Sequence, residues 1–215
     1  INLKIRSDVE SEINGMGPVI RKEDLELLYE QLDTLKDDDV LVLAGSIPSG
    51  MPQSIYRDIM SRLQSKRIKI AVDATKDLLM NVLAYHPFVI KPNNHELSEI
   101  FDIMIDSKEK AVVYAKELQK KGAQNVIVSM AGEGAVFVGS DGSVFTSEAP
   151  HGVVKNSVGA GDSMVAGFLA GYLAKGDYAE AFKMGLCTGS ASAFSDQLAT
   201  REEVEQVRRS HIFDF

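Results

Sequence analysis

The sequence predicts an α/β fold: a doubly wound, mostly parallel sheet flanked by helices. Two observations carry this prediction. Short apolar runs typical of strands alternate with longer amphipathic segments typical of helices. In addition, Val40–Ala44 is continuously apolar, too short for a helix, and ended by Gly45–Pro48, which indicates a strand buried on both faces of a parallel sheet. We expect right-handed crossovers between such strands.

Each element is justified by its local pattern. Leucines at helical spacing (Leu25, Leu28, Leu32) indicate an amphipathic helix. Two β-type runs, 135–138 and 144–146, are joined through Asp141-Gly142 and predict an antiparallel hairpin at a sheet edge. We expect strands at 1–6, 40–44, 68–72, 88–90 and 126–128. We expect helices at 23–35, 54–64, 78–83, 95–101, 108–120, 162–174 and 178–194, and a last one that begins at the Thr200–Glu203 capping box.

Composition excludes several classes of function. The chain has 215 residues with 45% hydrophobic and 25% charged, the balance of one globular domain. A net charge of −8 without a basic run argues against nucleic acid as a partner. No stretch of 18 apolar residues occurs, so we expect no membrane association and a cytoplasmic location. A single cysteine, Cys187, argues against disulfides and structural zinc.

The strongest chemical signal is the loop Val158–Ser163 (VGAGDS), which opens a predicted helix. Glycines allow backbone N–H groups to approach an anion, and a helix N-terminus offers unpaired N–H groups, so this segment predicts a phosphate cradle. Asp162 in the first turn is a candidate general base that accepts a proton from an alcohol. The alternative is that Asp162 only caps the helix and the glycines allow close packing.

Two further loops follow predicted strands, at the edge of the sheet where α/β proteins bind ligands. In Lys91–Glu96 (KPNNHE), Asn93 and Glu96 are three residues apart and suit a hydrated magnesium ion on ATP phosphates. The alternative is an ordinary helix start with an asparagine cap. The small-residue segment Ser129–Ala135 predicts a turn on which a nucleotide could lie, or a simple strand-to-hairpin turn.

Together these motifs resemble the ribokinase-like (phosphofructokinase B type) carbohydrate kinases, in the branch of 1-phosphofructokinases and tagatose-6-phosphate kinases. The segment Gly159–Ser163 is similar to that family's C-terminal signature, and residues 93–96 to its Asn-x-x-Glu element. The resemblance implies Asp162 as catalytic base and Gly159, Ala160 and Gly161 as anion hole. It implies magnesium at Asn93 and Glu96 through water. It implies ATP contacts at Lys91, Ser129, Ala131, Gly132, Gly134, Ser163, Gly189 and Ser192, and a substrate side at Gly45, Ser46 and Asn14.

Within the branch, residues 72–74, 85–87 and 198–201 look more like 1-phosphofructokinase. The resemblance therefore implies ATP-dependent phosphorylation of fructose 1-phosphate, with tagatose-6-phosphate kinase as the alternative. The family's Gly-Gly-Lys-Gly motif, its sugar-binding Asp and most of its lid have no counterpart here, and the chain opens at Ile1 within a strand-like run. We expect either a longer intact protein or a non-catalytic nucleotide-binding fragment. We expect residues 1–18 to be a remnant of the lid and sugar-side strands, and residues 19–215 to be the ribokinase-like α/β domain that binds nucleotide and carries catalysis. We expect the assembly to be a homodimer.

Overall fold

The protein is a three-layered α/β structure. The computed structural model describes residues 2–5, 11–14, 17–48 and 50–215. Its strands are β1 (Asn2–Ile5), β2 (Ser11–Asn14), β3 (Val40–Ala44), β4 (Lys69–Asp73), β5 (Val89–Ile90), β6 (Asn125–Ser129), β7 (Ala135–Val138) and β8 (Val144–Ser147). Its α-helices are α1 (Lys22–Asp33), α2 (Ile55–Leu63), α3 (Lys76–Met80), α4 (Asn94–Phe101), α5 (Lys108–Lys120), α6 (Ala160–Lys175), α7 (Tyr178–Phe194) and α8 (Arg201–Ser210), with 3₁₀ turns at Leu83–Tyr85 and Ala131–Glu133.

The main sheet has six strands in the order β3-β4-β5-β6-β7-β8. The pairs β3–β4, β4–β5 and β5–β6 are parallel, whereas β7 and β8 form an antiparallel hairpin at one edge. The predicted α/β class, the mostly parallel sheet and the edge hairpin are confirmed. Because β3, β4, β5 and β6 are mutually parallel, their carboxyl ends lie along one edge of the described sheet, whereas β7 runs the other way.

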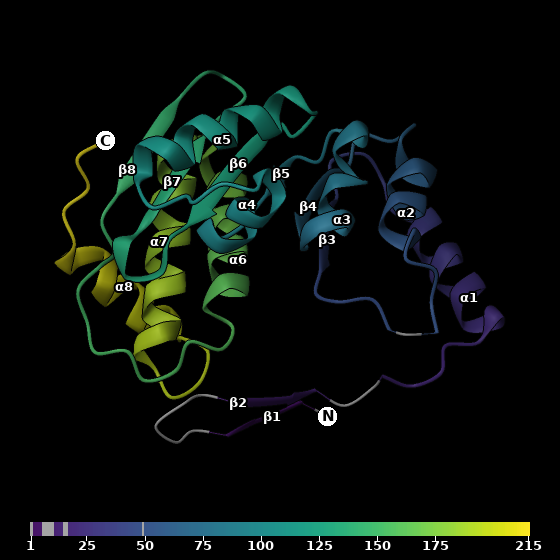
Figure 1. The fold of residues 1–215 in the computed structure, drawn as a ribbon, viewed down its shortest axis with the longest axis horizontal. Helices are drawn as coiled ribbons and strands as arrows, with labels where there is room; N and C mark the ends of the chain where they lie inside the picture. Colours follow the sequence, from purple (N-terminus) through teal and green to yellow (C-terminus); the bar gives the residue numbers. More distant parts are fainter. Residues whose placement is uncertain (1, 6–10, 15–16, 49) are drawn as a thin grey trace.

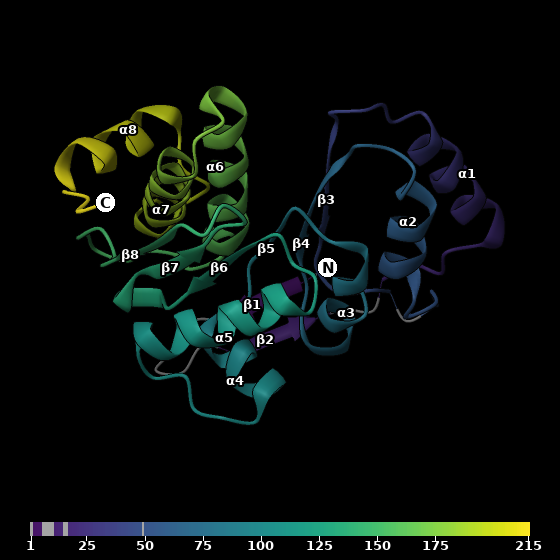
Figure 2. The ribbon, with the colours of Figure 1, turned by 90° about the horizontal axis from the view of Figure 1, so that it is seen from above.

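Helices cover both faces of this sheet, as Figures 1 and 2 show. Strand side chains alternate between two cores, because successive residues of a strand point to opposite faces. Val126 and Val128 belong to the core under α2, α3, α4 and α5, whereas Ile127 and Phe137 belong to the core under α6 and α7. Because both faces of β6 are covered by helices, Val126–Val128 is a continuous apolar run.

Strand β3 differs from the prediction that it is buried on both faces, and that prediction is wrong. Leu43 is 6% exposed on the face of α2, but Val42 on the other face is 46% exposed. The reason is position: β3 is an edge strand of the described sheet, and α6 lies over β4 and its neighbours rather than over β3 (Figure 2). A continuous apolar run predicts a strand, but it does not tell which faces are covered.

Helices α6 and α7 pack closely because glycines line their contact. A Cβ atom on Gly167 would lie 2.5 Å from Thr188 Oγ1 and 2.7 Å from the carbonyl oxygen of Met184. A Cβ atom on Gly189 would lie 3.0 Å from the carbonyl oxygen of Ala160. Close packing therefore fixes the start of α6 against α7, and with it the loop that was predicted to hold phosphate.

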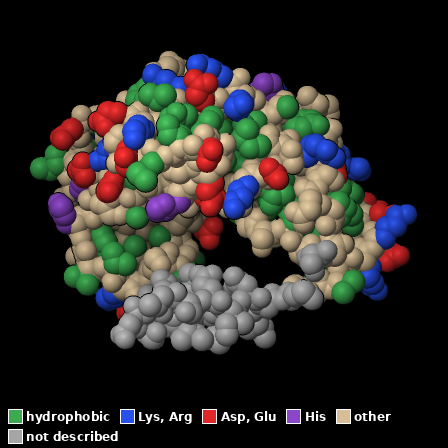
Figure 3. Space-filling view, viewed as in Figure 1, with side chains coloured by type: hydrophobic (Ala, Val, Ile, Leu, Met, Phe, Trp, Pro, Cys, Tyr) green, Lys and Arg blue, Asp and Glu red, His purple; other side chains and the backbone are tan. Residues whose placement is uncertain are grey.

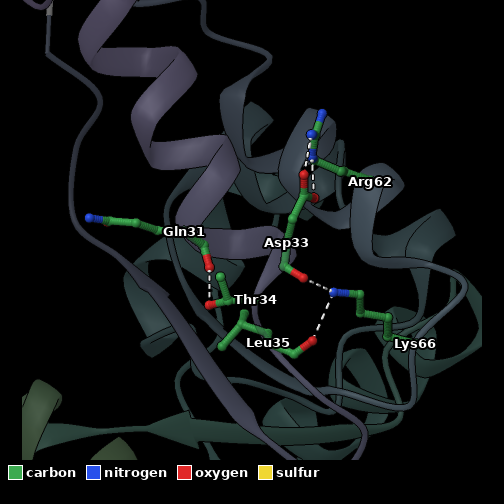
Figure 4. Close-up of polar contacts among 6 residues, drawn as sticks. All are labelled: Gln31, Asp33, Thr34, Leu35, Arg62 and Lys66. Carbon is green, nitrogen blue, oxygen red and sulfur yellow. Dashed lines mark hydrogen bonds and ion pairs between the residues drawn. The ribbon is translucent and has the colours of Figure 1, made fainter.

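Polar contacts (Figure 4) hold α1 against α2, which lie at the end of the molecule away from α6, α7 and α8 (Figure 1). The Arg62 guanidinium donates to both carboxylate oxygens of Asp33, and this pairing lowers the pKa of Asp33. Lys66 Nζ donates to the backbone oxygens of Asp33 and Leu35, carbonyls that lack intrahelical donors at a helix C-terminus. Both contacts lie away from the site predicted at the start of α6, and they stabilise the packing of α1 against α2 (Figure 1).

The short ribbon β1–β2 stands apart from the main sheet (Figure 1). On the described surface shown in Figure 3, side chains of Lys and Arg alternate with those of Asp and Glu, without a broad patch of one sign. None of the helices in the described ranges combines the length and apolar character that crossing a bilayer requires.

Candidate active site

The site forms where the carboxyl ends of β3, β4 and β5 meet the first turn of α6. Gly45 follows β3, Asp73 ends β4 and Lys91 follows β5. Because these strands are parallel neighbours, the three residues lie side by side, and the Gly45 N–H donates to the Asp73 backbone oxygen at 3.2 Å. Loop and helix starts at such an edge are where open α/β sheets bind ligands.

The predicted cradle has the geometry of an anion site. Gly159 is the N-cap of α6 with φ of +76°, a left-handed conformation that glycine adopts without strain. Of the three residues predicted as anion hole, Gly159 and Gly161 have N–H groups without an acceptor among the described residues, whereas the Ala160 N–H donates to the Ser157 oxygen at 3.3 Å. The Asp162 N–H also has no acceptor there, and the Ser163 N–H donates to the Gly159 oxygen at 2.8 Å. Asp162 is exposed in the same turn. Free donors and a carboxylate thus share one end of α6.

Lys91 reaches into this turn from β5. Its side chain is 7% exposed, and its Nζ lies 3.2 Å from the position that a Cβ on Gly161 would take. A larger residue at 161 would therefore press on the ammonium group. Lys91 was predicted as an ATP contact, and the structure places its charge directly beside the cradle, where it adds to the partial positive charge of the helix N-terminus.

Asp73 is the residue that sequence reasoning missed. Its carboxylate lies 3.3 Å from Lys91 Nζ and is 19% exposed. Burial raises the pKa of Asp73, the Lys91 charge opposes this shift, and the nearby Asp162 raises the pKa further. The signal was available, because Asp73 comes directly after the strand predicted at 68–72, just as Lys91 comes directly after the strand predicted at 88–90.

Asn93 and Glu96 form a reciprocal capping box at the start of α4. Asn93 Oδ1 accepts from Glu96 N–H at 2.8 Å, and Glu96 Oε2 accepts from Asn93 N–H at 2.9 Å. The helix-start interpretation is therefore confirmed. Burial raises the pKa of Glu96, partly offset by the bond from Asn93 and the charge of Lys91.

A magnesium role remains compatible with this geometry. Glu96 Oε1 has no partner among the described residues, and carboxylate oxygens are ligands that Mg²⁺ prefers. The described residues contain no group of three or more His, Cys, Asp or Glu side chains placed to hold a metal by themselves. The donor set thus fits an ion held mainly by phosphate oxygens and water, with Glu96 and Asn93 at its periphery.

Apart from Lys91, the seven residues predicted to contact ATP fall into two groups. Ser163 and Ser192 are buried and bond to each other, with Ser192 Oγ 2.8 Å from Ser163 Oγ, and Ser192 Oγ also accepts from Ala199 N–H at 3.1 Å. Gly189 is likewise packed against α6. Their visible role is to tie α7 and the following loop to the cradle.

The turn after β6 is the second group. Ser129 ends β6, and Ala131 and Gly132 lie in the 3₁₀ turn that follows, with open space beside Gly132. Gly134 has φ of +90°, and a Cβ there would lie 2.0 Å from the Ser147 backbone oxygen, so this glycine allows the turn to approach the end of β8. On the substrate side, Gly45 and Ser46 are exposed, whereas the side chain of Asn14 and all of residues 15–16 lie outside the described part.

Comparisons with known proteins identify the class to which this fold and site belong. A family model described as pfkB family carbohydrate kinase matches residues 3–203. The chain therefore belongs to the pfkB family of carbohydrate kinases, and the predicted class, an ATP-dependent sugar kinase with a ribokinase-like fold, is confirmed.

Individual relatives are more specific. The chain is 44% identical over 207 residues to a 1-phosphofructokinase of Bacillus subtilis, covering 96% of this chain and 68% of that protein. It is 29% identical to a D-tagatose-1-phosphate kinase of Bacillus licheniformis, covering 96% of this chain and 68% of the relative. It matches phosphofructokinase-2 from Escherichia coli in complex with substrates and products at 25% identity and a TM-score of 0.88, covering 97% and 69% of the two chains.

Proposed function

We propose that the protein transfers the γ-phosphoryl group of ATP to the 6-hydroxyl of fructose 1-phosphate, which yields fructose 1,6-bisphosphate and ADP. One observation carries the proposal: the free N–H groups at the start of α6, the Asp162 carboxylate and the Lys91 ammonium lie around one turn. Phosphoryl transfer needs mainly in-line positioning and neutralisation of charge, and this turn offers both. The name of the 44% identical relative supports fructose 1-phosphate as the acceptor.

Each group has a proposed role. Asp162 accepts the proton of the 6-hydroxyl. At the same time the 6-hydroxyl oxygen bonds to phosphorus, and the bond between phosphorus and the ADP oxygen breaks. The N–H groups of Gly161 and Asp162 and the Lys91 ammonium bind phosphoryl oxygens, whose charge they stabilise in the transition state. Asn93 and Glu96 would hold a Mg²⁺ ion through water, and the ion would supply neutralisation of phosphate charge.

The remaining assignments extend the same proposal. The nucleotide lies along the turn that contains Ser129, Ala131, Gly132 and Gly134, and the sugar lies toward Gly45 and Ser46, with Asn14 on the ribbon side. We propose residues 1–18 as part of a lid and residues 19–215 as the catalytic domain. We propose a homodimer, because a ribbon that stands apart from its own main sheet can pair with a partner's ribbon (Figure 1). The proposed location is the cytoplasm.

The decisive experiment is an ADP-release assay with MgATP and three acceptors in parallel: fructose 1-phosphate, tagatose 6-phosphate and tagatose 1-phosphate. Preferred turnover of fructose 1-phosphate supports the proposal. Preference for tagatose 1-phosphate, favoured as second candidate by the 29% identical relative, would keep the mechanism and change the substrate. ADP-dependent thermal stabilisation without turnover of any acceptor would instead indicate a nucleotide-binding module.

A further inference from the structure

Tyr56, on the first turn of α2, bonds to the end of β3. Its single hydroxyl proton is shared in a three-centre hydrogen bond between the backbone oxygens of Ala44, at 2.7 Å, and Gly45, at 3.1 Å. Its ring is half-buried and packs against the core beneath α2. Burial, together with the charge of Asp73, raises the pKa of Tyr56, so the hydroxyl keeps its proton and remains a donor.

This contact fixes the direction of the next peptide group. The C=O of Gly45 and the N–H of Ser46 belong to one planar trans peptide and point in opposite directions. Because the Gly45 oxygen faces the Tyr56 hydroxyl, the Ser46 N–H points away from it. Among the described residues, the Ser46 N–H and hydroxyl have no hydrogen-bond partner.

Gly45 allows the Gly45–Ser46 peptide to rotate away from the orientation seen in the structure. Its φ is +86°, and a Cβ placed on it would meet nothing within 4 Å, so open space lies beside it. Glycine populates several backbone conformations at similar energy, and the peptide that follows it can rotate unless something holds it. The Gly45 N–H is held by the Asp73 backbone oxygen at 3.2 Å, and the Gly45 oxygen is held by Tyr56.

We propose that Tyr56 is a positioning residue that locks the Gly45–Ser46 peptide, so that the Ser46 N–H is oriented to bind an oxygen of the sugar phosphate. The inference rests on the proposed function, because it takes the end of β3 as the acceptor side of the site. A preoriented N–H group costs less entropy when the ligand binds than one that must be ordered first. Tyr56 thereby sets the affinity for the acceptor without touching it.

The test is Tyr56→Phe, which keeps the ring and removes the hydroxyl. The matched control is Tyr178→Phe, because the Tyr178 hydroxyl bonds to Ser140 Oγ at 3.0 Å near the β7–β8 hairpin, away from the site. We expect Tyr56→Phe to raise KM for fructose 1-phosphate about 3- to 10-fold, the size of one net hydrogen bond, with KM for ATP and kcat within about 2-fold of wild type. Tyr178→Phe should change none of the three.

Unchanged KM values in Tyr56→Phe, or equal losses for both substrates, would overturn the proposal. A second measurement does not depend on turnover: fructose 1-phosphate is titrated into ¹⁵N-labelled protein and followed at the Ser46 amide. We expect the Ser46 resonance to shift in wild type as sugar is added. In Tyr56→Phe the sugar concentration that gives half of the full shift should be about 3- to 10-fold higher. If the Ser46 resonance does not shift when fructose 1-phosphate is added, or shifts at the same sugar concentration in wild type and Tyr56→Phe, the role of Tyr56 is refuted. Absence of turnover with a normal titration refutes only the proposed reaction.

Discussion

Lys91 Nζ lies 3.3 Å from the carboxylate of Asp73, and this pair joins the end of β4 to the residue that follows β5, beside the first turn of α6. Removing one partner of a buried pair leaves an uncompensated charge, which costs about 3 to 5 kcal/mol when both groups are fully enclosed. Since Asp73 retains 19% exposure, we expect Asp73→Asn to lower the free energy of unfolding by about 2 kcal/mol in urea titrations.

The matched control is the exposed pair Lys76–Glu99, which has the same 3.3 Å separation. Glu99→Gln should change stability by less than about 1 kcal/mol. The double variant Asp73→Asn/Lys91→Met should recover stability relative to Asp73→Asn, because no buried charge remains. Its affinity for ADP, but not for adenosine, should stay at least about tenfold below wild type if Lys91 binds phosphate. Equal affinities for ADP in the double variant and wild type would remove Lys91 from that role.

Asp162→Asn separates catalysis from helix capping. As general base, Asp162 should contribute about 10²- to 10⁴-fold to kcat, whereas an acidic residue in a first helical turn stabilises by only about 0.3 to 1 kcal/mol. We expect turnover to fall by that factor while ADP still raises Tm as in wild type. Near-normal turnover in Asp162→Asn would leave only the helix-start interpretation of the residue.

Two capping boxes allow a matched test of magnesium binding. Glu96 closes the box of Asn93, and Glu203 closes that of Thr200 on α8. Glutamine is also accepted at this position, so Glu96→Gln and Glu203→Gln should each change stability little. We expect only Glu96→Gln to raise the Mg²⁺ concentration needed for half-maximal turnover, because it alone removes a carboxylate beside the phosphates. Identical Mg²⁺ curves would argue that Glu96 serves the helix start alone.

The order of elements was predictable because the signals are local. Apolar runs, the leucine spacing of α1, the Asp-Gly hairpin turn and the Thr200 capping box each depend on a few neighbouring residues. The cradle was predictable for the same reason, since Gly159 and Asp162 are close in sequence. Among the described elements, strand β2 and two short 3₁₀ turns were missed, because β2 carries one apolar residue, Ile13, and the turns lack a periodic pattern.

What was missed or wrong depends on contacts between distant segments. Val42 is exposed because α6 covers other strands, and Asp73 belongs to the site because β4 and β5 are neighbours. The residues next to Val42 and Asp73 in the sequence predict neither the exposure of Val42 nor the position of Asp73 in the site. Likewise, Gly134 was assigned to ATP, and the structure shows that its contact with the end of β8 already requires glycine.

Gly134→Ala and Gly132→Ala compare two glycines of one turn. At Gly134, positive φ and a Cβ 2.0 Å from the Ser147 oxygen should lower the free energy of unfolding by about 3 kcal/mol or prevent folding. At Gly132 no atom lies within 4 Å of the new Cβ, so stability should stay within about 1 kcal/mol of wild type. If ATP lies along this turn, Gly132→Ala should still weaken ADP binding, measured by calorimetry. Unchanged ADP affinity would exclude Gly132 as a contact.

Cys187 provides a test of stability against pH. The thiol is buried between α7 and α8, and burial raises its pKa to about 12. In the unfolded chain the thiol has a pKa of about 8.5, so above that pH the unfolded state loses a proton that the folded state keeps. Stability from this group is therefore fully present below about pH 8.5 and falls as pH rises toward 12, by up to about 1.4 kcal/mol per pH unit.

Other groups also titrate in that range, so the relevant quantity is the difference between wild type and Cys187→Ala. We expect this difference in unfolding free energy to shrink by about 1 kcal/mol between pH 7.5 and pH 9.5 in urea titrations. A thiol reagent should also react with the folded protein only as fast as α7 opens, since the thiolate is the reactive form. Rapid labelling at pH 7.5, or a difference independent of pH, would contradict the buried, protonated thiol that the packing of α7 against α8 implies.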